Sequence, residues 1–142
     1  MNITFRKFIT PDKQLIDGWL KTDELGMQFL SSYVADDFVG LIDFKKRYLW
    51  IAYSAATPVG FFDFERESDE KGYFTFYVRP DFRGKGMGYE LLTGGLSLPE
   101  VKAVRVIEGG VEKDNVSSIK TLEKAGFKYS STDEDGMLMY QK

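Results

Sequence analysis

The segment Arg83-Gly84-Lys85-Gly86-Met87-Gly88 has the residue types and spacing to bind a phosphate group. It follows a strand-like run and precedes a helix-like run, so its last residues fall at a helix start. The first N–H groups of a helix have no internal partner and carry partial positive charge. Glycine lets the backbone turn sharply and approach an anion without a Cβ in the way. Because the segment also holds two cations, we expect it to bind a pyrophosphate.

Two common phosphate-binding motifs do not fit this segment. The dinucleotide fingerprint G-x-G-x-x-G, begun at Gly84, requires glycine where Tyr89 stands. The P-loop G-x-x-x-x-G-K-[ST] requires its first glycine at Arg79 and fails as well. The pattern that remains is Arg-x-x-Gly-x-Gly over residues 83–88. A glycine-rich turn that merely joins a strand to a helix is the alternative interpretation of these residues.

The chain contains neither histidine nor cysteine, which removes several catalytic classes. A histidine base, a serine–histidine triad, a histidine-ligated zinc site and a cysteine nucleophile are excluded. Acid–base chemistry must then come from carboxylates, lysine, tyrosine, the backbone or water. We expect no metal, and the lack of cysteine fits a reducing, cytoplasmic compartment.

Length and composition are those of one globular domain over residues 1–142. A hydrophobic fraction of 43% supplies a core, and a net charge of −3 gives no general attraction for nucleic acid. The N-terminus lacks the apolar region of a signal peptide, and no stretch approaches the roughly 20 apolar residues of a membrane helix. We therefore expect neither a nucleic-acid nor a membrane partner.

Strand-like and helix-like patterns alternate along the chain and predict an α/β fold with a mixed sheet. The run Tyr73–Val78 is apolar or aromatic on both alternations, which indicates a central strand covered on both faces. The expected strands are 3–8, 48–53, 59–64, 73–78, 101–106, 127–130 and 136–140, and the expected helices are 12–20, much of 22–44, 89–98 and 115–125.

Two blocks resemble the GCN5-related N-acetyltransferase (GNAT) family. The run Val78–Gly88 is similar to the coenzyme A signature of that family, including the preceding strand and the proline at position 80. Further along, Asn115 leads a helix that ends in Glu-Lys-Ala-Gly-Phe at 123–127. The blocks stand in the family's order and spacing and cover residues 73–127. The resemblance implies a GNAT-like acyl-CoA N-acyltransferase fold, a central mixed sheet flanked by helices. It also implies an acetyl-CoA-dependent N-acetyltransferase that acts on a primary amine of a small molecule, protein or peptide.

The resemblance further implies where acetyl-CoA binds. In the family the fourth and fifth strands splay apart and the pantetheine arm lies in the gap; here these strands would be 73–78 and 101–106. Backbone groups near Tyr77 and Val78 would bind the arm and polarise the thioester carbonyl. Asn115 would hydrogen-bond the arm with Ser118 nearby, although a helix N-cap and an ordinary first-turn residue also explain the two. The amides expected to hold the pyrophosphate are those of Arg83, Gly84, Lys85, Gly86, Met87 and Gly88.

The catalytic positions depart from the family pattern. In many members a tyrosine seven residues after the asparagine protonates the leaving sulfur. This chain has Leu122 at that position. Leu122 also continues an apolar helical stripe, which favours a role in the core. Tyr129 or Tyr140 could replace it, or the thiolate could leave unassisted. For the base that deprotonates the amine we select Glu70, near the start of the fourth strand, against the alternative of a solvated charged turn.

Three functions therefore remain open from the sequence. The first is direct acetyl transfer in a ternary complex, because without cysteine no acyl-cysteine can form. The second is a catalytically silent acyl-CoA-binding or sensing module, which Leu122 favours. The third is an unrelated phosphate-binding α/β domain. The sequence contains no motif that identifies the acceptor amine. A homodimer is expected only because many members of the resembled family form dimers.

Overall fold

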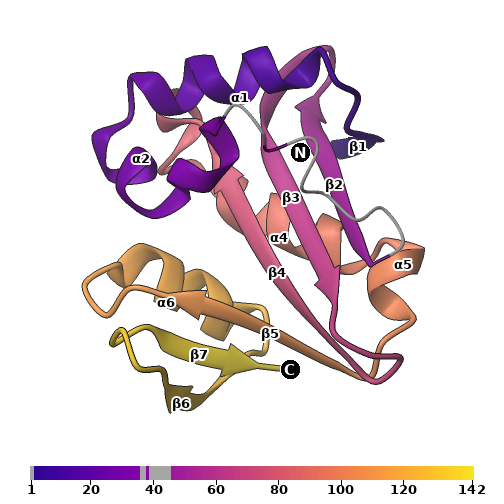
Figure 1. The fold of residues 1–142 in the computed structure, drawn as a ribbon, viewed down its shortest axis with the longest axis vertical. Helices are drawn as coiled ribbons and strands as arrows, with labels where there is room; N and C mark the ends of the chain where they lie inside the picture. Colours follow the sequence, from indigo (N-terminus) through magenta and orange to yellow (C-terminus); the bar gives the residue numbers. More distant parts are fainter. Residues whose placement is uncertain (1, 36–37, 39–45) are drawn as a thin grey trace.

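The computed structural model describes residues 2–35, 38 and 46–142, and these contain a seven-stranded mixed sheet (Figure 1). The strand order is β1-β2-β3-β4-β5-β7-β6. Neighbouring strands are antiparallel except β4 and β5, which are parallel. The sheet joins strands from both ends of the chain. Its strands are β1 (Ile3–Lys7), β2 (Arg47–Ser54), β3 (Thr57–Arg66), β4 (Lys71–Val78), β5 (Val106–Val111), β6 (Lys128–Thr132) and β7 (Leu138–Gln141).

Helices cover both faces of this sheet (Figure 1). One face carries α1 (Asp12–Lys21), α2 (Glu24–Leu30) and the 3-10 turn η1 (Ser31–Val34). The other face carries α4 (Met87–Leu96), α5 (Pro99–Lys102) and α6 (Val116–Lys124), and the short turn η2 (Pro80–Phe82) links β4 to α4.

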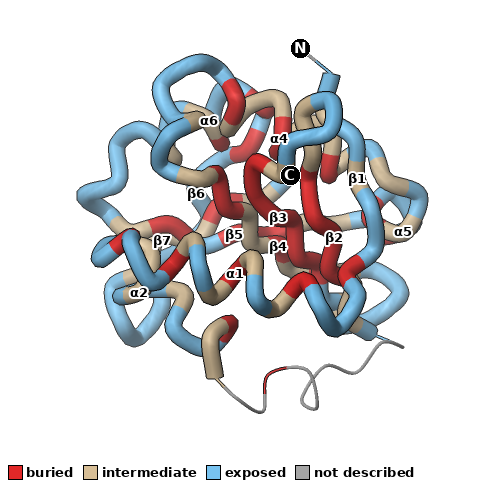
Figure 2. Tube along the Cα trace, turned by 90° about the horizontal axis from the view of Figure 1, so that it is seen from above, coloured by how far each residue is buried: buried red, intermediate tan, exposed pale blue. Residues whose placement is uncertain are grey.

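The central strands alternate their side chains between two hydrophobic cores. Phe61 of β3 packs with the α1 side, whereas its neighbour Phe62 packs with the α4 side, and both are fully buried. In β4, Tyr77 and Phe74 divide in the same way. Figure 2 shows the resulting buried centre, where β2, β3 and β4 run together. The expectation of a central strand covered on both faces is confirmed, as is the mixed α/β class.

The predicted strand at 101–106 is wrong. Residues 99–102 form helix α5, and strand β5 begins only at Val106. Val101 and Val104 are both buried and stand three residues apart, as do side chains on one face of a helical turn. Pro99 favours a helix start because its fixed φ suits the first helical position. Helix α4 also begins and ends two residues earlier than the predicted 89–98.

Helical structure predicted within 22–44 is found in α2 and η1, over 24–34. The rest of that prediction lies largely outside the described residues, at 36–37 and 39–44. Among the helices of the described ranges, none has the length and apolar character to cross a membrane.

Candidate active site

The glycine-rich segment forms a sharp loop that delivers the chain into helix α4. Gly84 and Gly86 have φ of +77° and +79°, a region that favours glycine. Gly86 is the N-cap residue and offers no side chain to the free N–H groups of the first turn, which begins at Met87. A Cβ at Gly84 or Gly86 would meet no other atom within 4 Å. The loop therefore presents backbone donors to an open space, as an anion site requires.

The two cations of the loop point to different tasks. Lys85 is exposed, so its charge can reach a phosphate in the open space. The Arg83 side chain is 45% exposed, but its guanidinium is bound to the fold: Nε donates to the carbonyl oxygen of Val78 at 2.8 Å, and Nη2 donates to Oδ2 of Asp23 at 2.9 Å. Because the Asp23 carboxylate neutralises it, Arg83 braces the loop in this structure rather than presenting charge to a ligand.

Strands β4 and β5 pair only over part of their length. Their parallel register runs from Lys71 and Val106 to Phe74 and Gly109, and β4 continues to Val78 beside β3 alone. The predicted splaying of these strands is therefore present, although β5 is not the predicted segment. The gap opens toward the glycine-rich loop, because that loop follows the end of β4.

Backbone alternation decides which β4 peptide groups face the gap. Arg79 N donates to Val59 O at 2.8 Å on β3, while Glu70 O accepts from Val106 N at 2.8 Å on β5. The N–H and C=O groups of odd-numbered residues of β4, including Tyr77, therefore point toward β3. Those of even-numbered residues point toward β5. Beyond Phe74, the groups that face the gap are those of Phe76 and Val78. Sequence reasoning missed Phe76, because the alternation could be assigned only once both partners of β4 were known.

The Tyr77 side chain is buried on the α1 face, where it meets Asp23. Its ring stacks on Trp19 and on Phe61, with centroids 6.4 and 5.4 Å away, and its hydroxyl donates to Asp23 Oδ2 at 2.9 Å. Burial and this hydrogen bond raise the pKa of Tyr77 above its ordinary value. Burial alone would raise the pKa of Asp23, but hydrogen bonds from Gly26, Tyr77 and Arg83 outweigh it and lower that pKa. Asp23 is therefore a buried carboxylate that stays ionised.

Asn115 and Ser118 lie beyond the end of β5, at the start of α6. Asn115 is the N-cap, and its side-chain oxygen accepts from Ser118 N at 3.2 Å, which confirms the capping interpretation. The capping bond uses the amide oxygen of Asn115 and leaves its NH₂ as the donor for a ligand. Their binding of the pantetheine arm stays a prediction.

Leu122 is a core residue, and the two tyrosines named as substitutes lie on the last hairpin. The Leu122 side chain is 2% exposed within the core under α4 and α6, as its apolar stripe predicted. Tyr129 is 55% exposed on β6, with its hydroxyl 2.7 Å from Thr132 Oγ1. Tyr140 of β7 is buried and packs edge-on against Tyr129.

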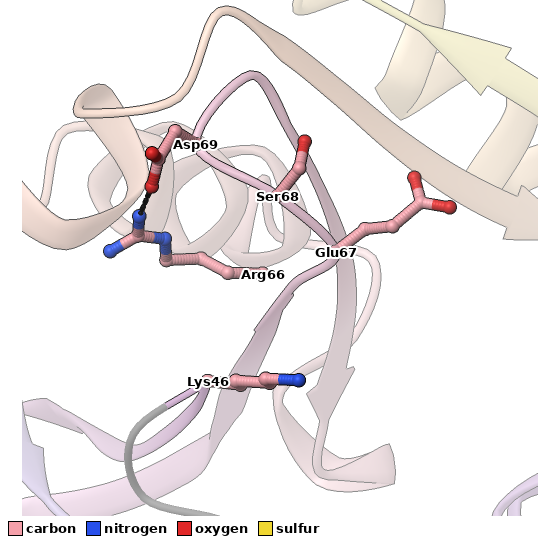
Figure 3. Close-up of a pocket in the computed structure, with 5 residues that line it drawn as sticks. All are labelled: Lys46, Arg66, Glu67, Ser68 and Asp69. Atoms are coloured by element: carbon pink, nitrogen blue, oxygen red, sulfur yellow. Dashed lines mark hydrogen bonds and ion pairs between the residues drawn. The ribbon is translucent and has the colours of Figure 1, made fainter.

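Glu70 lies apart from the other predicted site residues. It is exposed in the turn before β4, and its nearest cation is Arg105 at 3.7 Å. Since the glycine-rich loop follows the other end of β4, the 8-residue strand separates them by about 26 Å. The same turn borders a shallow surface hollow in which Arg66 and Asp69 are paired at 2.5 Å (Figure 3). That hollow is lined by Lys46, Arg66, Glu67, Ser68 and Asp69.

A different carboxylate lies close to the gap. Glu108 of β5 is 7% exposed and stands opposite Tyr73, one pair before the ladder ends at Phe74 and Gly109. Gln141 Nε2 donates to Glu108 Oε2 at 2.5 Å, and Lys71 Nζ lies 3.7 Å from that oxygen. Because side chains of paired residues share a face, Glu108 lies on the face that carries Tyr77. Sequence reasoning missed Glu108 because it placed the fifth strand too early.

The mixed sheet parts between two parallel strands, and a glycine-rich helix start lies at the open end of the gap. This arrangement suits an extended ligand that carries a phosphate group. The model of the Acetyltransferase (GNAT) family matches residues 16–127, so the chain belongs to this family. The resemblance seen in the two sequence blocks is thereby confirmed.

Individual relatives agree with this assignment. The chain is 26% identical over 137 residues to the uncharacterized N-acetyltransferase YfmK of Bacillus subtilis, covering 94% of this chain and 92% of that one. An acetyltransferase from Thermus thermophilus has the same fold, with a TM-score of 0.81 at 17% identity over 100% of this chain and 97% of that one. Campylobacter jejuni N-acetyltransferase PseH in complex with acetyl coenzyme A has a TM-score of 0.72 at 16% identity, over 99% and 98%.

Proposed function

We propose that this chain transfers an acetyl group from acetyl-CoA directly to a primary amine of a small molecule, protein or peptide. The observation that carries the proposal is the parting of β4 and β5 beyond Phe74, with the glycine-rich loop and the start of α4 at its open end. Membership of the GNAT family ties this arrangement to acetyl-CoA and to N-acetyl transfer.

The residues around the gap fit an acyl-CoA arm. The N–H groups of Phe76 and Val78 repeat at about 6.6 Å, so an extended arm with amides of its own can pair with them and with Phe76 O as an added strand, while Val78 O accepts from Arg83. The N–H groups of Met87 and Gly88, at the start of α4, suit the pyrophosphate, and exposed Lys85 adds positive charge. The open space at the loop glycines leaves room for the phosphates.

The reaction needs a group that takes a proton from the amine. Acetyl-CoA supplies an activated acetyl carbon; the amine nitrogen bonds to that carbon, the C–S bond breaks, and its electrons leave with the CoA sulfur. A lysine-like ammonium has a pKa of about 10.4, so the amine must be deprotonated before it attacks. We assign this task to Glu108, because it is a buried carboxylate one pair from the gap. Glu70 suits this task less well, because its side chain is 71% exposed in the turn before β4, four residues from the last ladder pair at Phe74.

The proton on the departing thiolate does not come from position 122, since leucine has none to give and is enclosed in the core. Tyr77 is also a poor acid, because its raised pKa and its hydrogen bond to Asp23 hold the proton in place. Tyr129 and Tyr140 lie on the β6–β7 hairpin, where the Tyr129 hydroxyl is paired with Thr132 Oγ1 and Tyr140 is buried. Of the alternatives that the sequence left open, we therefore propose that the thiolate leaves unassisted and is protonated by water.

The first test is the thermal midpoint with and without acetyl-CoA, for the wild type and for Gly86→Trp. Ligand at 100 times its Kd stabilises a folded protein by about 2.7 kcal/mol, which gives a measurable shift. We expect the shift in the wild type and not in a folded Gly86→Trp variant, whose indole would occupy the open space. CoA release on addition of amines then separates catalysis from silent binding. A well-folded wild type that shows no shift at millimolar acetyl-CoA would contradict the proposal.

A further inference from the structure

Asp23 joins three parts of the molecule that are distant in sequence. As the N-cap of α2 it accepts from Gly26 N through Oδ1 at 3.1 Å. Its other oxygen, Oδ2, accepts from the Tyr77 hydroxyl and from Arg83 Nη2, each at 2.9 Å. The residue is 7% exposed. One buried carboxylate therefore holds a helix on the α1 face, the end of β4 and the glycine-rich loop.

Arg83 connects Asp23 to Val78, one of the residues that border the gap. While Nη2 binds Asp23, Nε donates to Val78 O at 2.8 Å, and the guanidinium lies 5.3 Å from the centre of the Tyr77 ring. Val78 faces the gap, and Arg83 is the first residue of the glycine-rich segment. The position of Arg83 therefore sets the loop relative to the end of β4.

Helix α1 contributes to the same junction. Trp19 stacks on Tyr77 at an interplanar angle of 16°, and the Arg79 guanidinium lies 5.8 Å from the centre of the Trp19 ring. Figure 1 shows that α1 and α2 lie across the end of β4, away from α4 and α6. The loop is thus braced from the sheet face that bears Glu108, the residue to which we assign deprotonation of the amine.

We propose that Asp23 is a positioning residue: through Arg83 it holds the end of β4 and the glycine-rich loop in the form that binds acetyl-CoA. Affinity for acetyl-CoA then depends on α1 and α2, which lie on the opposite face from α4. The inference rests on the proposed function, since it concerns the same acetyl-CoA site. Without the Asp23 carboxylate, the half-exposed Arg83 guanidinium keeps only its bond to Val78 O, and water can solvate its charge in other rotamers.

The test is acetyl-CoA affinity by isothermal titration calorimetry in Asp23→Asn, at a temperature where the variant is folded. Asparagine keeps the shape of the side chain and the oxygen that caps Gly26 N, but removes the charge that holds Arg83. We expect Kd for acetyl-CoA to rise about tenfold, which corresponds to about 1.4 kcal/mol. The matched control is Asp17→Asn on α1, whose partner Lys13 is 3.0 Å away on the surface, and its Kd should match the wild type.

A double-mutant cycle separates positioning from simple stabilisation. If Asp23 acts through Arg83, the variant carrying both Asp23→Asn and Arg83→Gln should bind acetyl-CoA within twofold of Arg83→Gln alone. A purely structural Asp23 would lower the thermal midpoint of Asp23→Asn and leave its Kd within twofold of the wild type, which overturns the inference. Should Asp23→Asn not fold, Arg83→Lys gives the same reading, because lysine cannot bind Val78 O and Asp23 through two fixed donors.

The two proposals fail in different ways. A folded wild type that does not bind acetyl-CoA overturns the proposed function. A wild type that binds, beside an Asp23→Asn variant that binds equally well, overturns only the role of Asp23. In steady-state kinetics we expect Asp23→Asn to raise KM for acetyl-CoA with a smaller change in kcat, whereas Glu108→Gln should mainly lower kcat.

Discussion

Phe74 and Gly109 form the last pair of the parallel ladder between β4 and β5, and the Phe74 ring lies over the position where Gly109 has no side chain. A Cβ on Gly109 would approach the ring atom Cζ to 2.4 Å. The same ring meets Phe127 edge-on at a centroid distance of 5.2 Å, so it has core neighbours on its other side. The absence of a side chain at 109 therefore lets an aromatic ring close the core immediately below the gap.

Gly109→Ala should accordingly destabilise the protein. The added methyl group must displace Phe74 within a packed core, and overpacking of this kind costs about 1–3 kcal/mol. Thermal or denaturant unfolding measures the change. Gly18→Ala is the control, since a Cβ there would meet nothing within 4 Å in helix α1 and should stabilise by up to about 1 kcal/mol. A Gly109→Ala variant as stable as the control would show that Phe74 can yield freely.

Local motifs were sufficient to predict a sharp glycine-rich loop that leads into a helix. The conformation of residues 83–88 depends on two glycines with positive φ and on the helix that follows, and all of these are adjacent in the chain. The cap at Asn115 was predictable for the same reason. The fifth strand was not, because Gly109 and Gly110 weaken its strand pattern, whereas the valines of 101–106 imitate one.

Long-range contacts were beyond such reasoning. Asp23 and Arg83 are 60 residues apart, and nothing in the sequence near Asp23 indicates more than a helix cap. The partners of Arg83 were equally unpredictable. A cation in a glycine-rich loop suggests phosphate binding, and only the fold shows that Arg83 donates to Asp23 and Val78. Glu70 was selected because the resembled family often has a glutamate near the start of the fourth strand, and the sequence does not reveal how far that point lies from the gap.

Glu70→Gln and Glu108→Gln form a matched pair for locating the base. We expect Glu70→Gln to keep kcat/KM within about twofold, because the side chain is 71% exposed at the far end of β4. Glu108→Gln removes the carboxylate beside the gap and should lower kcat by about 10²–10⁴-fold, the range of general-base catalysis. Steady-state rates with a common amine and saturating acetyl-CoA decide between them. The reverse ranking would return the role to Glu70.

Leu122 should behave as a core residue and not as a vacant catalytic position. Leu122→Met, which nearly conserves volume, should cost less than about 1.5 kcal/mol, whereas Leu122→Ala should cost about 2–5 kcal/mol. Leu122→Tyr should overpack the core and lower the thermal midpoint without raising kcat. A stable Leu122→Tyr variant with a higher kcat would instead mean that the phenol reaches the departing sulfur.

The pKa of Asp23 predicts how stability changes in acid. Hydrogen bonds from Gly26, Tyr77 and Arg83 hold the folded pKa below the ordinary value of 3.8, against the opposing effect of burial. The unfolded chain therefore takes up a proton on Asp23 at a higher pH than the folded protein does. This stabilisation is complete above the unfolded pKa and disappears as the pH falls through the folded pKa.

The free energy of unfolding of the wild type should thus exceed that of Asp23→Asn at pH 7, and the difference should shrink below about pH 4. Urea unfolding of both proteins between pH 7 and pH 3 measures it, with Asp17→Asn as the surface control. A difference that stays constant over this range would mean that Asp23 has the same pKa in the folded and the unfolded protein, so that its ionisation adds nothing to stability.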